Sequence, residues 1–367
     1  MRVSSDTLWF RLFFCCGLFI LAGCDSTDPD PDPEPPENVL TLQDVEGLKN
    51  AAPYPVGVAI ASDKIIQAGH QAIINHAFNN ITAEWEMKMN PVSVGPGTYS
   101  WDRPDGLVNF AEANGLNVHG HTLIWHTTTP LWIQNFSGDN AEFEIAIERY
   151  ITDVVTRYKG RVASWDVVNE VFEDGSGALR TSEFQQRMGD DFVARLFEYA
   201  HAADPDALLF YNDYGTIWDG TKRQAMLDMI DDLLARGIPI HGVGLQMHIT
   251  IDFPAMSEIV ATMQAISDRG LKVHISELDV RVNPNGDISS LSSARSEAQK
   301  ARVKELIQAF NNLPEEHRFA VTMWGVRDSE SWLINFWGNP EWPLLFDDLF
   351  NPKPAYIGFL EALQEAG

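Results

Sequence analysis

Two glutamates, Glu170 and Glu277, stand where a pair of carboxyl groups could do chemistry. Each comes near the end of an apolar run, VASWDVVNE at 162–170 and LKVHISELDV at 271–280. A carboxyl group within or after an apolar strand is partly shielded from water, which raises its pKa. One member of a pair can then stay protonated while the other is ionised. Two such groups about 5–5.5 Å apart are what cleavage of a glycosidic bond with retention requires. The two glutamates therefore predict a sugar-cleaving site if the fold brings them together.

The elements that must position this pair form a strand–helix alternation after residue 38. Apolar periodicity at i, i+3, i+4 over 147–158 and 303–310 predicts helices, and Gly115, Gly160, Gly237 and Gly270 each close a helical segment before a strand. This pattern favours an α/β fold with one (β/α)8 barrel over 39–367, although a doubly wound sheet has the same local pattern. Eight short apolar runs are the expected strands: 55–61, 79–85, 116–125, 162–170, 207–213, 242–248, 271–280 and 319–326.

Polar residues follow almost every one of these runs. In a closed barrel, active-site groups gather at the carboxyl ends of the strands. Glu170 and Glu277, on the fourth and seventh strands, are expected to face each other across the barrel mouth. The other strand-end candidates are Glu84, Glu86, Lys88, His121, Trp125, His126, Asn169, Asn212, Asp213, Tyr214, Gln246, His248, Asp279 and Trp324.

An ordered set of strings carries a resemblance to a known family. These strings are GHTLIWH at 120–126, WDVVNE at 165–170, YNDY at 211–214, GVGLQMH at 242–248, HISELDV at 274–280, WGVRDSESW at 324–332 and PLLFDD at 343–348. Over roughly residues 50–363 the chain resembles glycoside hydrolase family 10. The resemblance implies a (β/α)8 barrel and a retaining endo-β-1,4-xylanase acting on xylan or xylo-oligosaccharides, with neither cofactor nor metal.

The resemblance also implies roles for single residues. Glu170 resembles the acid/base and Glu277 the nucleophile; Asn169 resembles the residue that binds the sugar 2-hydroxyl, and His248 the imidazole that holds the nucleophile. Asp279 resembles a partner of that network. The remaining matches are polar contacts to the non-reducing sugars at Glu84, Lys88, His121 and Gln246, aromatic walls at Trp125, Trp324 and Trp332, and a stacking residue at Tyr214.

Three positions depart from the family pattern. Trp85 stands where an Asn that binds the second sugar is usual, Thr128 replaces a common Gln, and Leu333 replaces a basic residue. These departures put the outer sugar sites in doubt and leave the catalytic pair intact.

The triplet His119-Gly120-His121 invites a metal interpretation. Its two imidazoles share a strand face, but no flanking carboxylates complete a zinc set, so we expect no metal site. His70, His76 and His119 are expected to be surface or core residues.

Two other functions compete with a xylanase. One is a related barrel β-glycanase, such as a β-glucanase, with altered outer sugar sites. The other is a surface sugar-binding lipoprotein without turnover, against which the intact Glu170 and Glu277 argue.

The N-terminal residues have the pattern of a targeting segment. Arg2 and Arg11 flank the start of a short apolar run, and Leu21-Ala22-Gly23-Cys24 resembles a bacterial lipobox. We expect residues 1–23 to be removed, Cys24 to be acylated, and residues 24–38, with six acidic residues among their prolines, to be an extended tether. The protein would then be exported and anchored to a bacterial membrane, with the outer membrane as the expected one and the cell surface as one location; an ordinary signal peptide is the alternative.

The overall charge excludes one large class of partner. A formal charge of −26 is unsuited to nucleic acid, which needs clustered Lys and Arg. The expected partners are a neutral polysaccharide and, through the lipid, a membrane, and the expected state is a monomer.

Overall fold

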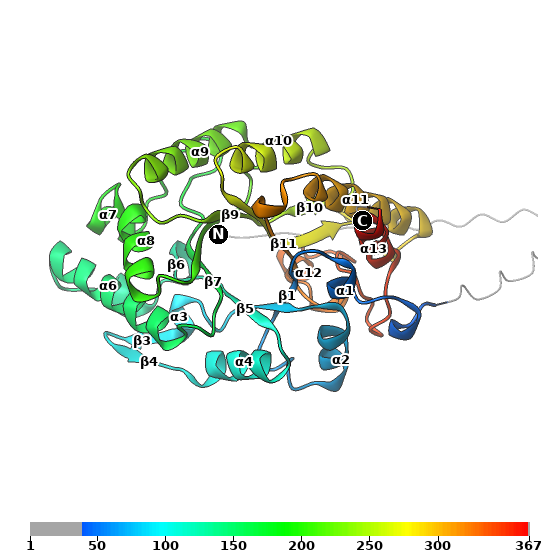
Figure 1. Ribbon diagram of the computed structural model, residues 1–367, viewed down its shortest axis with the longest axis horizontal. Coiled ribbons are helices and arrows are strands. Elements are labelled where there is room, and N and C mark those ends of the chain that lie inside the picture. Colours follow the sequence, from blue (N-terminus) through cyan, green and yellow to red (C-terminus); the bar gives the residue numbers. More distant parts are fainter. Residues whose placement is uncertain (1–38, 366–367) are drawn as a thin grey trace, which may run out of the picture. The chain divides into compact units, whose positions relative to one another are not determined.

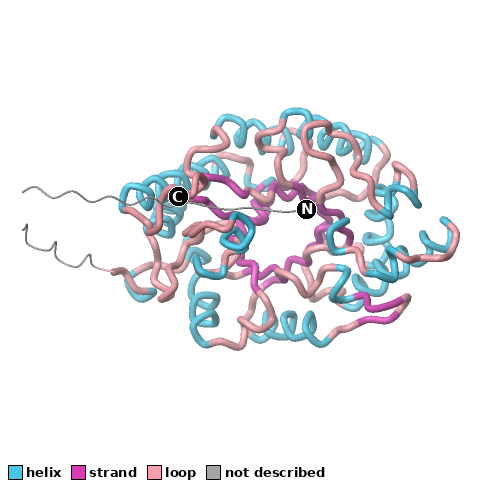
Figure 2. The backbone as a smooth tube through the Cα atoms, turned by 180° about the vertical axis from the view of Figure 1, so that it is seen from behind, coloured by secondary structure: helices cyan, strands magenta, loops and turns pink. Residues whose placement is uncertain are grey.

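The computed structural model describes residues 39–365, and the chain from Leu40 onward forms one compact unit. Within it, eight parallel strands close into a barrel, because β12 pairs with both β11 and β1. Figure 1 and Figure 2 show the strands as a ring with the helices outside it. The barrel strands are β1 (Val56–Ile60), β2 (Asn80–Ala83), β5 (Asn117–Gly120), β7 (Ser164–Asn169), β8 (Leu208–Asp213), β9 (Gly242–Leu245), β11 (Lys272–Arg281) and β12 (Arg318–Met323).

A long helix follows each barrel strand, which confirms the predicted (β/α)8 architecture. The outer helices are α2 (Ala68–Ala77), α4 (Asp102–Ala113), α6 (Asn140–Arg157), α8 (Phe192–Ala203), α9 (Gly220–Ala235), α10 (Met256–Ser267), α11 (Ser293–Asn311) and α13 (Pro354–Gln364). Shorter elements complete the described chain: η1 (Leu42–Asp44), α1 (Leu48–Ala51), α3 (Met89–Val92), β3 (Ser93–Gly95), β4 (Thr98–Tyr99), β6 (Ile124–Trp125), η2 (His126–Thr128), α5 (Leu131–Gln134), α7 (Glu183–Met188), β10 (His248–Thr250), η3 (Glu315–His317), η4 (Asp328–Glu330) and α12 (Trp332–Trp337).

Local chemistry explains several helix boundaries. The side chain of Asp139 accepts a hydrogen bond from Glu142 N, while the Glu142 carboxylate accepts one from Asp139 N, and this reciprocal pair starts α6. Gly160 has φ of +72°, a left-handed conformation that glycine adopts without a Cβ clash. The three other predicted helix-ending glycines, Gly115, Gly237 and Gly270, also have positive φ.

Two of the predicted strands are each divided into two in the structure. The run 116–125 divides into β5 and β6, and β6 pairs only with β7. The run 242–248 divides into β9 and β10, and β10 leaves β9 to pair with β11. Both breaks come directly before polar residues of the mouth, His121 and Gln246.

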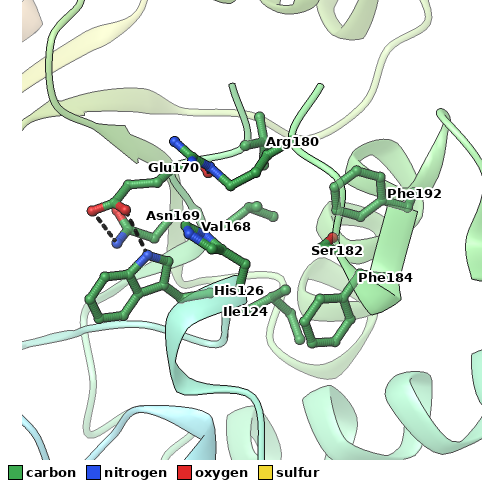
Figure 3. Close-up of a pocket in the computed structure, with 11 residues that line it drawn as sticks. Ile124, His126, Val168, Asn169, Glu170, Arg180, Ser182, Phe184 and Phe192 are labelled. Atoms are coloured by element: carbon green, nitrogen blue, oxygen red, sulfur yellow. Dashed lines mark hydrogen bonds between the residues drawn. The ribbon is translucent and has the colours of Figure 1, made fainter. Parts of the chain in front are cut away.

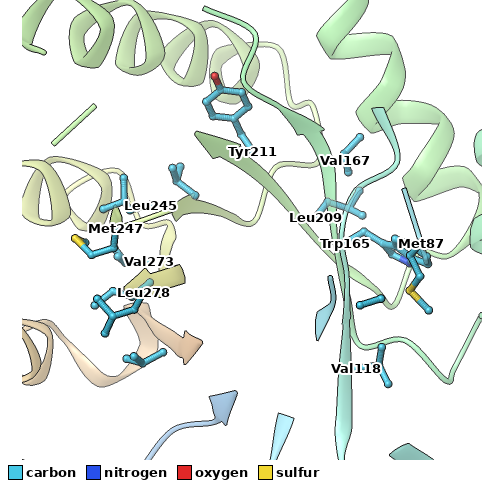
Figure 4. Packing of buried hydrophobic residues seen from close by; sticks show 14 of the residues in the cluster. Met87, Val118, Trp165, Val167, Leu209, Tyr211, Leu245, Met247, Val273 and Leu278 are labelled. Atoms are coloured by element: carbon cyan, nitrogen blue, oxygen red, sulfur yellow. The ribbon is translucent and has the colours of Figure 1, made fainter. Parts of the chain in front are cut away.

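The apolar core lies mainly between the strands and the helices. Trp165, Val167 and Leu209 are fully buried there on the neighbouring strands β7 and β8 (Figure 4). Residues on the alternate face of β7 point into the barrel and are polar, among them Ser164 and Asp166. The outward residues therefore pack against the helices, while the barrel interior combines polar groups such as Ser164 and Asp166 with the rings of Phe210 and Phe319, which contact His119. No helix among residues 39–365 is long and apolar enough to cross a bilayer.

Candidate active site

Glu170 follows β7 directly, at the carboxyl end of the fourth barrel strand. Its backbone has φ of +59°, which is left-handed and costs a non-glycine residue about 1–3 kcal/mol. Neighbouring groups hold this conformation, because Glu170 N donates to Asn212 O over 3.0 Å and Arg180 Nε donates to Glu170 O over 3.3 Å. The turn aims the carboxylate at the barrel mouth rather than along the strand.

Three donors then fix the Glu170 carboxylate. Trp125 Nε1 donates to Oε2 over 2.8 Å, and Gln246 Nε2 and Asn169 Nδ2 donate to Oε1 over 2.9 and 3.3 Å. Figure 3 shows the carboxylate turned toward Asn169. The side chain is only 9% exposed, so these donors replace most of its water.

Glu277 lies on β11, the seventh barrel strand, which continues past it to Arg281, close to the predicted bounds of 271–280. Its carboxylate is 5% exposed and accepts a hydrogen bond from Asn212 Nδ2 over 2.7 Å. The same nitrogen lies 3.0 Å from Asn169 Oδ1, and Asn169 in turn bonds Glu170. One chain of side-chain amides therefore joins the two carboxylates, and the predicted pair does come together at the barrel mouth.

A histidine–aspartate pair stands behind Glu277. His248 Nε2 lies 3.3 Å from Glu277 Oε2, and His248 Nδ1 lies 2.9 Å from Asp279 Oδ2. Although burial lowers the pKa of His248, the charge of Asp279 and the hydrogen bonds to both carboxylates outweigh it and raise this pKa to about 10. His248 is therefore an imidazolium at neutral pH. Trp332 Nε1 donates to the same Asp279 oxygen over 3.0 Å and keeps the pair in place.

The positive charges around Glu277, that of His248 among them, set the protonation state of its carboxyl group. Burial raises the pKa of Glu277, but the hydrogen bond with His248 and the charges of His121, His248 and Lys88 together bring it below 4.5. Glu277 is therefore an ionised carboxylate across the neutral range, in a site almost closed to water. That is the state required of a nucleophile or of an electrostatic stabiliser.

Three indole rings surround the ammonium group of Lys88. Lys88 Nζ lies 4.8 Å from the ring centre of Trp125, 5.7 Å from that of Trp85 and 5.8 Å from that of Trp324. Burial lowers the pKa of Lys88, while the charges of Glu277, Glu84 and Glu170 oppose this. The aromatic faces attract the ammonium group and help to hold it at the mouth.

Glu84 follows β2 beside Lys88 and is only partly buried. Burial raises the pKa of its carboxyl group, and the charge of Lys88 opposes this. The two predicted polar contacts thus share one side of the mouth.

His119 and His121 both turn toward Asp166 on the neighbouring strand. His119 Nε2 and His121 Nδ1 lie 3.1 and 2.8 Å from the same oxygen, Asp166 Oδ2. Burial raises the pKa of Asp166, but the two imidazoles outweigh it and hold this pKa well below its usual range. The two histidines do share a face, and the carboxylate near them, which the sequence argument missed, comes from β7. His121 also meets the ring of Trp324 at 5.4 Å between centroids, so it supports the mouth.

Tyr214 is held by a second network, which runs from the exposed Asp174 to the buried Lys222. Its hydroxyl donates to Asp174 Oδ2 over 2.7 Å, and the Lys222 ammonium lies 3.7 Å from the ring centre. Lys222 is fully buried and also contacts Asp213 over 2.9 Å. Burial raises the pKa of Asp213 to about 7, against the opposing charge of Lys222. These contacts fix Tyr214 next to the Glu170 loop.

Comparison with known proteins agrees with this geometry. The profile of glycosyl hydrolase family 10 matches residues 46–362. The chain belongs to glycosyl hydrolase family 10. It is 36% identical to endo-beta-1,4-xylanase Xyn10C of Cellvibrio japonicus over 351 residues, covering 87% of this chain and 58% of the relative. It is 40% identical to endo-1,4-beta-xylanase A of Cellvibrio japonicus (strain Ueda107) over 347 residues, covering 86% of this chain and 56% of that protein.

The fold comparison leads to the same family. Xylanase10C of Cellvibrio japonicus, solved as a mutant in complex with xylopentaose, superposes with a TM-score of 0.85 at 35% identity and covers 89% of this chain and 70% of that chain. The chain spans little more than half the length of these two Cellvibrio japonicus xylanases.

The three departures from the family 10 pattern occupy different environments. Leu333 is 1% exposed and Thr128 is 4% exposed, so both side chains are packed in the protein. Trp85 is 38% exposed beside Lys88, so it alone of the three changes the surface of the mouth.

Asn212, a strand-end candidate from the string YNDY without a predicted role, lies at the centre of the site. It is fully buried and contacts both Asn169 and Glu277, and Ser276 Oγ donates to its Oδ1 over 2.6 Å. Gly244 makes room for it, since a Cβ at 244 would lie 2.1 Å from Asn212 Oδ1. The signal available in the sequence was an amide residue at an inward-facing position of an apolar strand, opposite a glycine on the next strand.

Proposed function

We propose that this family 10 chain is a retaining endo-β-1,4-xylanase that hydrolyses internal bonds of xylan by double displacement. The observation that carries the proposal is the amide chain through Asn212 and Asn169, which joins the ionised Glu277 to Glu170. The xylanase names of the relatives, and the xylopentaose bound to one solved neighbour, support xylan as the substrate.

In the first step, a Glu277 oxygen attacks the anomeric carbon, and the bond from that carbon to the leaving oxygen breaks. Glu170 gives its proton to that oxygen as the bond breaks. The product is an ester between Glu277 and the sugar. The imidazolium of His248, held 3.3 Å away, keeps Glu277 ionised and correctly aimed before the attack.

In the second step, water attacks the anomeric carbon and the ester bond to Glu277 breaks. Glu170, now a carboxylate, takes a proton from the water. Two inversions give net retention. Asn169 sits between the two carboxylates and is placed to bind the sugar 2-hydroxyl, while Lys88, Glu84, His121 and Gln246 are proposed to bind the sugars on one side of the cleavage point.

Aromatic side chains complete the proposed sugar site. Trp125 and Trp324 stand around Lys88, and Trp332 covers His248 with 5.0 Å between ring centroids. Tyr214, next to the acid/base loop, is proposed to stack on the leaving-group side. Flat rings suit the flat faces of xylose.

Two measurements test this proposal. Proton NMR in the first minutes of hydrolysis should show the β-anomer before the α-anomer, and an initial α-anomer would exclude double displacement. Product profiles on soluble xylan and on carboxymethyl cellulose should show a series of xylo-oligosaccharides from xylan. Greater activity on carboxymethyl cellulose would instead identify a β-glucanase.

We propose separately that the mature protein begins at an acylated Cys24, is exported, and acts as a membrane-anchored monomer. The support is the lipobox-like Leu21-Ala22-Gly23-Cys24 and the acidic, Pro-rich stretch after it, which lie outside the described residues. Several acyl chains anchor a protein stably where one is marginal. Cys24→Ser should move active enzyme from the membrane fraction to the soluble fraction, and a wild-type protein found only in the soluble fraction would reject the anchor.

A further inference from the structure

The exposed aromatic side chains are confined to one end of the barrel. Among residues 39–365, the exposed Phe and Trp side chains are Trp85, Phe253, Phe336 and Trp337. Trp85 follows β2, Phe253 follows β10, and Phe336 and Trp337 lie in α12 after β12. All four therefore lie in segments that follow the carboxyl ends of strands, the end that carries Glu170 and Glu277.

Phe336 and Trp337 form a continuous row with the proposed catalytic centre. His248, which contacts Glu277, meets Trp332 at 5.0 Å between ring centroids. Trp332 meets Phe336 at 5.0 Å, and Phe336 meets Trp337 at 5.1 Å. Trp332 is half-buried, whereas Phe336 and Trp337 are 64% and 50% exposed. The row leads from the reaction centre out to solvent.

Trp337 is exposed and yet held in place. The Arg281 guanidinium lies 4.4 Å from its ring centre, and Arg281 Nε donates to Glu341 over 3.0 Å. Glu341 is itself buried, and its other oxygen accepts from Val282 N and Asn283 N. The indole therefore rests on a neutralised, fixed ion pair. A ligand that stacks on it loses little affinity to ordering the ring.

We propose that Phe336 and Trp337 form an additional carbohydrate-binding surface, which holds a neutral sugar ring of the xylan chain away from the cleavage point. This rests on the proposed xylanase function. An uncharged ring is the ligand that fits, because the charge of Arg281 is already matched by Glu341 and the protein as a whole is strongly acidic. Stacking against apolar sugar C–H groups needs only a flat, fixed, partly dry face, which Trp337 supplies.

The test compares long and short substrates in the full chain. In the variant Phe336→Ala/Trp337→Ala, the ratio of kcat/KM on polymeric xylan to kcat/KM on an aryl xylobioside should fall about tenfold, as expected for losing stacking contacts. Ile145→Ala is the matched control, since Ile145 is 64% exposed on the outer helix α6. Its ratio should equal that of the wild type.

A binding measurement separates this surface from catalysis and from folding. Glu277→Ala should be retarded in a gel containing soluble xylan, and adding Trp337→Ala should reduce that retardation, with thermal melts verifying that both variants fold. Equal retardation, or an unchanged substrate ratio in an enzyme that hydrolyses xylan, would overturn the surface and leave the xylanase proposal standing. A wild-type protein that hydrolyses no xylan would instead reject the xylanase proposal itself.

Discussion

Asn212 donates a hydrogen bond from Nδ2 to Glu277 Oε1 over 2.7 Å. The same nitrogen reaches Asn169 Oδ1, so one buried amide sets the position of Glu277 relative to the residue next to Glu170. Displacing Asn212 should therefore disturb both carboxylates without removing either.

Replacing Asn212 by Ala should lower kcat/KM on xylo-oligosaccharides about ten- to hundredfold, because a hydrogen bond to a charged group is worth about 1.5–3 kcal/mol. Ser276→Ala is the control, since Ser276 bonds only Asn212 Oδ1 and leaves Nδ2 free to act. Its effect should be clearly smaller. Steady-state kinetics on xylotetraose would decide, and equal losses in the two variants would remove Asn212 from its positioning role.

Gly244→Ala should impair catalysis from one strand away. The new Cβ would lie 2.1 Å from Asn212 Oδ1, so the amide must move and the Glu277 carboxylate with it. We expect kcat to fall at least tenfold, the size of the loss of one charge-assisted hydrogen bond. Gly106→Ala is the matched control, because nothing lies within 4 Å of a Cβ there and Gly106 is in α4. That variant should keep its kcat and gain up to about 1 kcal/mol of stability. Normal kcat in Gly244→Ala would show that Asn212 is not fixed by packing.

The barrel and the pair Glu170 and Glu277 could be predicted because both correspond to local patterns in the sequence. Apolar runs and helix-ending glycines mark the (β/α)8 repeats, and Glu170 and Glu277 stand within them. The side-chain contacts between neighbouring strands could not be predicted, because they depend on strand register. Asp166 contacts His121 from the neighbouring strand, and the two residues are 45 positions apart in the chain. The strand breaks after Gly120 and Leu245 also escaped prediction, since apolar runs do not mark where a strand leaves its neighbour.

The two glutamates should respond differently to substitution. Glu170→Ala should retain cleavage of aryl xylobiosides with good leaving groups, because these need no proton, and azide should partly restore its turnover by taking the place of water. Glu277→Ala should lose activity on activated and natural substrates alike. Stopped assays with and without azide would measure both. Similar behaviour of the two variants on the activated substrate would mean that the roles are assigned wrongly.

His248 should make stability depend on alkaline pH. Its pKa is about 10 in the folded protein and near 6.5 when unfolded, so the folded state binds this proton more tightly. The resulting stabilisation is complete below pH 6.5 and is lost as pH rises toward 10. The pKa of Asp213 is raised to about 7, so its carboxyl group has lost its proton by about pH 8 and does not contribute to the decline above that pH. Urea unfolding at pH 8, 9 and 10 should therefore show a steeper decline in wild type than in His248→Gln. Parallel curves would contradict an imidazolium at this position.

Trp85 is the departure from family 10 that changes the surface of the mouth, since it is 38% exposed and its ring centre lies 5.7 Å from Lys88 Nζ. An indole there can stack on a sugar, whereas the usual Asn would bind a hydroxyl with a net gain of about 0.5–1.5 kcal/mol. Because the ring faces the cation that stands among the proposed sugar contacts, we expect stacking. Trp85→Asn should lower kcat/KM on xylotetraose two- to tenfold, about the range set by that hydrogen bond. An aryl xyloside with a single sugar should be hydrolysed equally by both proteins, because it does not reach Trp85. A rise on xylotetraose would show that the indole blocks the second sugar, and a change confined to the aryl xyloside would place Trp85 at the cleavage point itself.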